Sequence, residues 1–129
     1  MITIKSYTDL EQSKKLAEIL PPESADMFYD GVQDLYKEKT YNIPMNGSSI
    51  TVRTGHIITE KGIKANLLLP AWSLTALLDV LDRGALFKTP QGWACQSYID
   101  FKAITSDHHS NPVDACVDMI ERLHELNLL

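Results

Sequence analysis

The chain has 129 residues, of which 44% are hydrophobic and 22% are charged. This fits one globular domain over residues 1–129 and excludes a disordered or fibrous protein. Seventeen acidic and twelve basic residues give a formal net charge of −5, so no broad positive surface favours binding of nucleic acid. The sequence has no apolar run long enough to span a membrane and no signal-peptide pattern, so we expect a cytoplasmic protein.

A helix is predicted near the N-terminus. Thr8 and Glu11 have the spacing of a capping box, which satisfies the first backbone amides of a helix. Apolar residues then recur on one side of the segment, and lysines and glutamates take the other side. Pro21 and Pro22 cannot continue a helix, so we expect it to end by Leu20.

The middle of the chain is predicted to be an antiparallel meander. Residues 23–39 precede it and have a weak pattern that is typical of short helical turns. Asn46-Gly47 predicts a hairpin turn because both residues tolerate positive φ. Further glycines separate short apolar stretches, which indicates more turns between strands. The expected strands span residues 41–45, 49–53, 56–59 and 63–69.

The clearest helix signal begins at Ser73. Its hydroxyl is placed to cap the first turn, and Trp72 before it is placed to pack on Leu77 as a hydrophobic staple. Leucines recur on one side of the following residues. Gly84 is suited to end the segment in a left-handed conformation. We therefore predict a helix over residues 73–81.

The best strand signal lies over residues 93–102, after a turn at Pro90-Gln91-Gly92. Side chains there alternate between two sets, as they do on the two faces of a strand. This alternation places Trp93 and Phe101 on one face and Tyr98 on the other.

A C-terminal helix is the last predicted element. Asn111 is placed as its N-cap, and Pro112 occupies its first position. Cys116 in this helix and Cys95 in the strand both lie in apolar-patterned segments, so we expect buried thiols rather than a disulfide or zinc ligands. The predicted buried face comprises Val113, Cys116, Val117, Ile120, Leu123 and Leu126.

Together these elements predict an α+β fold. We expect about three helices to pack on one face of a small antiparallel sheet of four or five strands. The helix over residues 73–81 and the C-terminal helix are expected to supply most of the core.

Two helix-opening segments resemble a type of small hypothetical protein that is carried by gut Bacteroidetes genomes and by their phages or mobile elements. They are Pro70-Ala71-Trp72-Ser73-Leu74, with its leucine-rich continuation, and Pro112-Val113-Asp114-Ala115-Cys116. The resemblance implies a shared fold rather than a shared activity, because these residues cap helices or fill a core. It is compatible with an accessory role in a phage or mobile element, including interference with a host protein.

The run Asp107-His108-His109 is the most chemically suggestive feature. Imidazoles and a carboxylate can bind a metal or transfer protons near neutral pH. Adjacent side chains diverge on a regular strand or helix, so both histidines would reach one ion only from an irregular loop. The alternative is a polar loop before a helix, and we predict no metal and no cofactor. Groups that would have to approach the run in space are His56, Asp118 or His124.

Aromatic side chains supply a second set of candidates. Trp72, Trp93 and Tyr98 combine a large apolar area with a polar atom, which is typical of residues at interfaces. The alternative for both tryptophans is burial in the core. Tyr98 lies on the predicted strand face opposite Trp93, among polar residues, and therefore marks a place to look for a partner. The candidate binding residues are Trp72, Trp93, Tyr98, His108 and His109.

We interpret the chain as a non-catalytic binding or interaction protein, and we expect a homo-oligomer, because its recognisable motifs serve folding. One alternative is a small hydrolase in which residues 107–109 act near His56 or His124. That enzyme requires these side chains to converge in a concave pocket. Another alternative is a small-ligand-binding protein with an enclosed aromatic pocket at Trp72 or Trp93.

Overall fold

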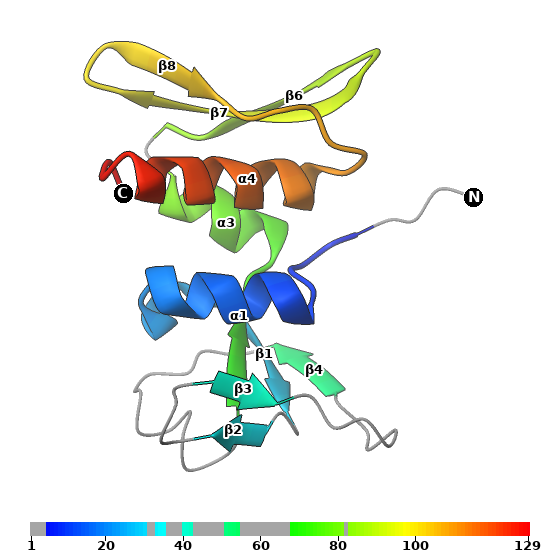
Figure 1. The fold of residues 1–129 in the computed structure, drawn as a ribbon. Helices are drawn as coiled ribbons and strands as arrows, with labels where there is room; N and C mark the ends of the chain where they lie inside the picture. Colours follow the sequence, from blue (N-terminus) through cyan, green and yellow to red (C-terminus); the bar gives the residue numbers. More distant parts are fainter. Residues whose placement is uncertain (1–4, 31–32, 36–39, 43–50, 55–67, 82) are drawn as a thin grey trace. The chain divides into compact units, whose positions relative to one another are not determined.

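The computed structural model describes residues 5–30, 33–35, 40–42, 51–54, 68–81 and 83–129. It divides the chain into two compact units, which we call the C-terminal unit (residues 1–8 and 73–129) and the central unit (residues 9–72). Each unit combines helix and strand, which confirms an α+β fold (Figure 1). Among the helices described, none is long and apolar enough to cross a membrane.

The central unit pairs one α-helix with short strands. In the described part of this unit the elements are α1 (Leu10–Ile19), the 3-10 helix η1 (Pro22–Ser24), β1 (Met27–Asp30), β2 (Gln33–Leu35), β3 (Thr40–Asn42), β4 (Thr51–Thr54) and β5 (Leu68–Ala71). Strands β4, β1 and β5 form an antiparallel sheet in that order, and β2 and β3 pair separately. Helix α1 packs against β5.

Helix α1 confirms the predicted N-terminal helix but begins with a different cap. The Asp9 carboxylate accepts a hydrogen bond from the Gln12 amide at 2.8 Å, and the Gln12 side chain accepts one from the Asp9 amide at 3.1 Å. The capping box is therefore Asp9 with Gln12, not Thr8 with Glu11. A carboxylate at the N-cap also interacts favourably with the positive end of the helix dipole, which a hydroxyl does not.

The prediction of helical turns over residues 23–39 holds only at its start, where residues 23 and 24 belong to η1, and is wrong for residues 27–30 and 33–35, which form strands. Strand β1 follows η1 and is the central strand of its sheet. Tyr29 in β1 lies opposite Val52 of β4 on one side and opposite Leu69 of β5 on the other. Both partners are far away in sequence, so tertiary pairing overrides the weak local preference.

The structure describes only part of the predicted meander. The Asn46-Gly47 turn and the strand expected over residues 56–59 lie outside the described residues. Strands β3 and β4 occur where strands were expected, but β3 pairs with β2 and β4 pairs with β1. The hairpin between the two is therefore not confirmed by the described pairings.

In the C-terminal unit, α3 (Leu74–Val80) confirms the helix predicted over residues 73–81. The Ser73 hydroxyl accepts a hydrogen bond at 3.2 Å from the amide three residues on, as an N-cap does. The left-handed residue after the helix is Arg83, with a φ of 53°, and not Gly84. A Cβ on Gly84 would lie 2.8 Å from a leucine side chain of the preceding turn, so close packing explains the glycine.

The rest of this unit is a three-stranded antiparallel sheet with a helix on it. The sheet contains β6 (Ala85–Thr89), β7 (Gly92–Ile99) and β8 (Lys102–Thr105), with β7 in the middle. The turn between β6 and β7 lies at Pro90-Gln91, as predicted.

The strand predicted over residues 93–102 is too long. Strand β7 ends at Ile99, and Asp100 and Phe101 have φ values of 51° and 65°. Two residues with positive φ between antiparallel strands are typical of a type I′ hairpin turn. Phe101 lies in this turn and is 92% exposed, so its expected place on the same strand face as Trp93 is wrong. The sequence pattern concealed the turn because Asp-Phe is an unusual pair for it.

Helix α4 (Pro112–Glu125) packs against β7, and α3 packs against α4 (Figure 1). The Asn111 side chain accepts a hydrogen bond at 2.9 Å from the Asp114 amide, which confirms the predicted cap. Leu126 follows the helix and is 57% exposed, so it does not belong to the buried face. The buried residues of α4 are Val113, Ala115, Cys116, Val117, Met119, Ile120 and Leu123.

The finer architecture differs from the expectation. The described strands belong to three sheets rather than to one sheet of four or five strands. In the C-terminal unit the layers run from the sheet to α4 and then to α3. Short strands such as β6, with little alternation of their own, are stabilised by pairing and were therefore not visible in the sequence.

Candidate functional site

The sheet β6-β7-β8 has two unlike faces. Cys95 is fully buried on the side of α4, where its thiol is hydrogen-bonded to that of Cys116. Because side chains alternate along a strand, Tyr98 points to the other side, and Ala103 lies directly opposite it on β8. No described element of this unit covers that side (Figure 1). Its exposed or half-buried residues, which we call the open face, are Ala85, Phe87, Gln96, Tyr98, Ala103 and Thr105.

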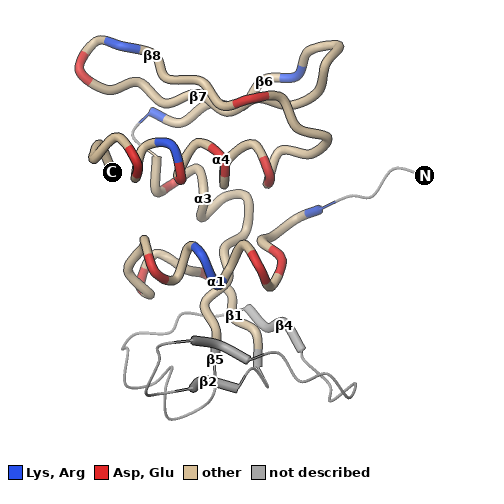
Figure 2. The backbone as a smooth tube through the Cα atoms, in the orientation of Figure 1, with Lys and Arg blue, Asp and Glu red and all other residues tan. Residues whose placement is uncertain are grey.

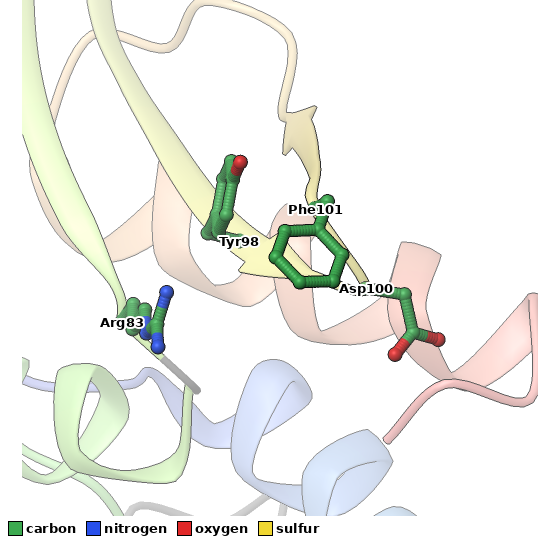
Figure 3. A pocket seen from close by; sticks show the side chains of 4 residues that line it. All are labelled: Arg83, Tyr98, Asp100 and Phe101. Atoms are coloured by element: carbon green, nitrogen blue, oxygen red, sulfur yellow. The ribbon is translucent and has the colours of Figure 1, made fainter.

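One end of the open face is hollowed. The hollow has a volume of about 210 Å³ and is lined by Arg83, Tyr98, Asp100 and Phe101 (Figure 3). The Arg83 guanidinium lies 5.8 Å from the centre of the Tyr98 ring, within the range of a cation–π interaction. Figure 3 shows the two charged side chains on opposite sides of the two aromatic rings. The hollow therefore offers apolar contact in its middle and opposite charges at its two ends.

Phe101 has an unfavourable backbone conformation. Its φ of 65° is left-handed, and this region costs an L-residue about 1–2 kcal/mol relative to the right-handed one. Glycine, asparagine and aspartate are the usual residues at such positions. The ring is 92% exposed, so burial of its apolar area in the fold does not offset this cost. A strained conformation combined with an exposed aromatic ring motivates a functional explanation.

Charge is distributed unevenly over the C-terminal unit (Figure 2). Helix α4 carries four acidic residues and one arginine. The sheet and its turns instead carry more positive than negative side chains, namely Arg83, Lys88 and Lys102 with Asp100. Lys88 lies opposite Trp93 and Lys102 lies opposite Ile99, so both lysines point to the α4 side of the sheet. The charged side chains beside the open face are Arg83 and Asp100, which line the hollow at its end.

A second cluster joins the loop after β8 to α4. His109 Nε2 lies 2.9 Å from Asp118 Oδ2, and Arg122 Nε donates to Asp118 Oδ1 at 3.0 Å. Arg122 also forms an ion pair with Asp107 at 2.6 Å, and the Asp107 amide donates to Asp118 at 3.0 Å. Of the three groups considered as neighbours of the run 107–109, Asp118 is in contact with it. These contacts fasten the loop to the helix.

The pKa of the Asp118 carboxyl reflects two opposing causes. Burial raises it, but hydrogen bonds from His109, Arg122 and the Asp107 amide outweigh burial and bring the pKa below its usual value. The hydrogen bond with Asp118 and the negative charge of that residue raise the pKa of Arg122 in turn. Asp118 is therefore a carboxylate at neutral pH and holds three groups in place.

Asp118→Asn should lower the free energy of unfolding by about 1–2 kcal/mol at pH 7, because the charge that accepts these hydrogen bonds is lost. The lowered pKa makes the contribution of Asp118 complete above about pH 4, near the unfolded value, and removes it as the pH falls through the folded-state pKa. Urea unfolding of both proteins at pH 7 and near pH 3 measures this. The stabilities should converge in acid.

The matched control is His108→Ala. His108 neighbours the cluster but is exposed, so its loss should change the free energy of unfolding by about 0.5 kcal/mol or less. Equal stability of wild type and Asp118→Asn at pH 7 would show that the cluster does not stabilise the fold.

The two cysteines are free and fully buried, as predicted. The hydrogen bond with Cys95, together with burial, raises the pKa of the Cys116 thiol. A nucleophilic cysteine has to ionise near neutral pH in a partly exposed, electropositive setting. This pair instead belongs to the contact between β7 and α4.

The predicted binding residues have different surroundings. Trp72 is fully buried in the central unit, where its indole donates to Ser24 Oγ at 2.9 Å. Trp93 is half-buried on β7, with the Lys88 ammonium 5.6 Å from its ring centre. Tyr98 is 36% exposed on the open face, opposite in direction to Trp93, as the alternation predicts.

The two candidate histidines differ. His109 is half-buried and joined to Trp93 by two backbone hydrogen bonds of 2.7 and 2.8 Å, whereas His108 is exposed. His124 is exposed at the end of α4, and His56 lies outside the described residues. In the described part of the chain, no group of three or more histidine, cysteine or acidic side chains is arranged to hold a metal ion. The His109–Asp118 pair does not line the hollow.

Sequence reasoning found Tyr98 but missed its neighbours in the hollow. The sequence analysis singles out no function for Arg83, and it places Phe101 in a strand, on the same face as Trp93. A β-turn at Asp100-Phe101 has no glycine or asparagine to reveal it. The five polar and apolar residues after Tyr98 continue the alternation smoothly, so only the pairing of β7 with β8 exposes the turn.

Comparisons of the chain with protein families, with curated proteins and with solved structures found no match.

Proposed function

We propose that this chain is a non-catalytic binding protein that contacts another protein chain through the open face and the hollow at its end. Phe101 carries the proposal: a 92% exposed aromatic ring is held in a left-handed turn. Aromatic residues and arginine are enriched in protein interfaces, and tyrosine and arginine are among the residues that most often contribute a large part of the binding energy. An accessory role in a phage or mobile element is compatible with such a surface.

The contrast with the histidine cluster supports this choice over the hydrolase. His109, Asp118 and Arg122 hold one another and the loop, which explains their positions without substrate. Phe101 has no comparable role in the fold, because its ring is almost wholly exposed. A residue that lowers stability and fills no core is best explained by a contact outside the fold.

Phe101→Asn should leave the free energy of unfolding unchanged or raise it by up to about 1 kcal/mol, because asparagine tolerates a left-handed conformation better than phenylalanine. Chemical unfolding measures this. A loss of more than about 1 kcal/mol would instead assign the Phe101 ring a structural role and remove the observation on which the proposal rests.

A photo-reactive phenylalanine analogue placed at position 101 tests the contact itself. In cells that make the full chain, irradiation should yield a discrete protein adduct at position 101. The matched control carries the same analogue at position 91, where Gln91 is exposed in the turn at the other end of β7. No adduct at position 101, or equal adducts at both positions, would contradict the proposal.

A further inference from the structure

We infer that the partner at the open face is a second copy of this chain, bound about a two-fold axis that passes through the hollow. This inference rests on the proposed function and names its partner. In this arrangement the Phe101 rings of the two copies enter each other's hollows. Arg83 of each copy meets Asp100 of the other.

The charges of the hollow favour this partner. Arg83 and Asp100 line the same hollow, and Figure 3 shows them on opposite sides of Tyr98 and Phe101. A two-fold axis between the two ends exchanges them, so Arg83 of each copy faces Asp100 of the other and the pair occurs twice in the dimer. A purely acidic partner would be attracted by Arg83 but repelled by Asp100, and a purely basic one would meet the reverse. The hollow is electrostatically complementary to itself.

The dimensions agree with a reciprocal insertion. A cavity of about 150 Å³ is sufficient for one benzene ring, and the hollow measures about 210 Å³. Phe101 is the most exposed of the large hydrophobic side chains described in this unit, so each copy presents both a ring and a hollow that accepts one. Tyr98 and Phe101 offer the aromatic surface against which an inserted ring packs in offset or edge-to-face geometry.

The remainder of the open face extends the contact. Ala103 lies opposite Tyr98, and Thr105 lies farther along β8 opposite Gln96. Both side chains are small and exposed, and they allow two sheets to approach closely. Stable dimers bury about 1,600 Å² in total, and one hollow with part of a three-stranded sheet supplies less. We therefore expect a dissociation constant in the micromolar range.

Sedimentation equilibrium of the full chain across micromolar concentrations tests the inference. Wild type should form a dimer and no larger species, because a two-fold contact closes on itself. Phe101→Asn should raise the dissociation constant about thirtyfold or more, as expected for the central residue of an interface. A wild-type chain that stays monomeric throughout this range would overturn the inference.

Charge reversal distinguishes a reciprocal contact from any other. Arg83→Asp and Asp100→Lys should each raise the dissociation constant about tenfold or more, because like charges then face each other twice. An equimolar mixture of the two variants should form a heterodimer, since every pair across the axis is then of opposite sign. Both positions are exposed, and unfolding curves confirm that each variant is folded.

The outcomes separate this inference from the proposed function. Two results would overturn the reciprocal contact. One is a dimer whose dissociation constant none of the three substitutions changes. The other is a mixture of the two charge-reversal variants that does not form a heterodimer. A monomer in isolation, together with an adduct at position 101 to a different protein, would overturn the self-association alone and leave the open face as a protein-binding surface. The absence of any adduct at position 101 would contradict both.

Discussion

Leu77→Ala is expected to lower the free energy of unfolding by about 2–5 kcal/mol, the range for truncating a buried leucine. Leu77 is fully buried in α3, and α3 packs against α4, the helix with the longest buried face in the C-terminal unit. Truncation removes apolar contacts and leaves a cavity that neighbouring side chains fill only in part. Urea or guanidinium unfolding at constant pH measures the loss.

Asp79→Ala in the same helix is the matched control. Asp79 is exposed near the C-terminal end of α3, where a negative charge interacts unfavourably with the helix dipole. Its replacement should change the free energy of unfolding by about 0.5 kcal/mol or less. A loss below about 1 kcal/mol for Leu77→Ala would show that α3 does not contribute to the core as its burial indicates.

Gly92→Ala is expected to lower the free energy of unfolding by about 2–4 kcal/mol, from backbone strain and overpacking together. Gly92 has a φ of 127°, a conformation that L side chains rarely adopt. A Cβ there would lie 2.5 Å from the carbonyl oxygen of His109. That oxygen belongs to the backbone and accepts a 2.7 Å hydrogen bond from the Trp93 amide, so it cannot move without breaking the bridge.

Gln91→Ala serves as the control for this substitution. It lies in the same turn, is exposed, and makes a side-chain contact only with Thr89 among the bonds described there. Its loss should cost about 0.5 kcal/mol. If Gly92→Ala unfolded at the same denaturant concentration as wild type, the close approach of residues 92 and 109 would be refuted.

The same substitution should also affect the cluster around Asp118. Displacing the His109 backbone moves the imidazole that hydrogen-bonds to Asp118 at 2.9 Å. The effects of Gly92→Ala and Asp118→Asn should therefore be less than additive in the double variant, because both disturb one network. Strict additivity would mean that the turn and the cluster are energetically independent.

Local chemistry explains the parts of the fold that were predicted correctly. The Ser73 cap, the Asn111-Pro112 start and the turn at Pro90-Gln91 each depend on residues a few positions apart. Such signals are complete within one segment and do not require a partner elsewhere in the chain. The buried state of Cys95 and Cys116 followed in the same way from apolar patterning.

The open face and its hollow could not be predicted in this way. Tyr98 was identified as exposed, because alternation along one strand determines direction. The neighbours of Tyr98 in the hollow were not identified. Arg83 precedes β6 and Phe101 follows β7, and only the antiparallel register brings these two ends of the sheet together. Pairing between strands is a non-local interaction, and the turn at Asp100-Phe101 lacks the residues that usually announce it.

The sequence by itself determined the positions of the three described α-helices, of the Ser73 and Asn111 caps and of the turn at Pro90-Gln91, and that the chain is α+β. Tertiary structure alone decided that β1 lies between two distant strands, that Phe101 is exposed, and that Asp118 meets His109. The physical reason is the range of the forces involved. Capping and helical periodicity act within a few residues, whereas strand pairing and ion-pair networks require segments that only folding brings into contact.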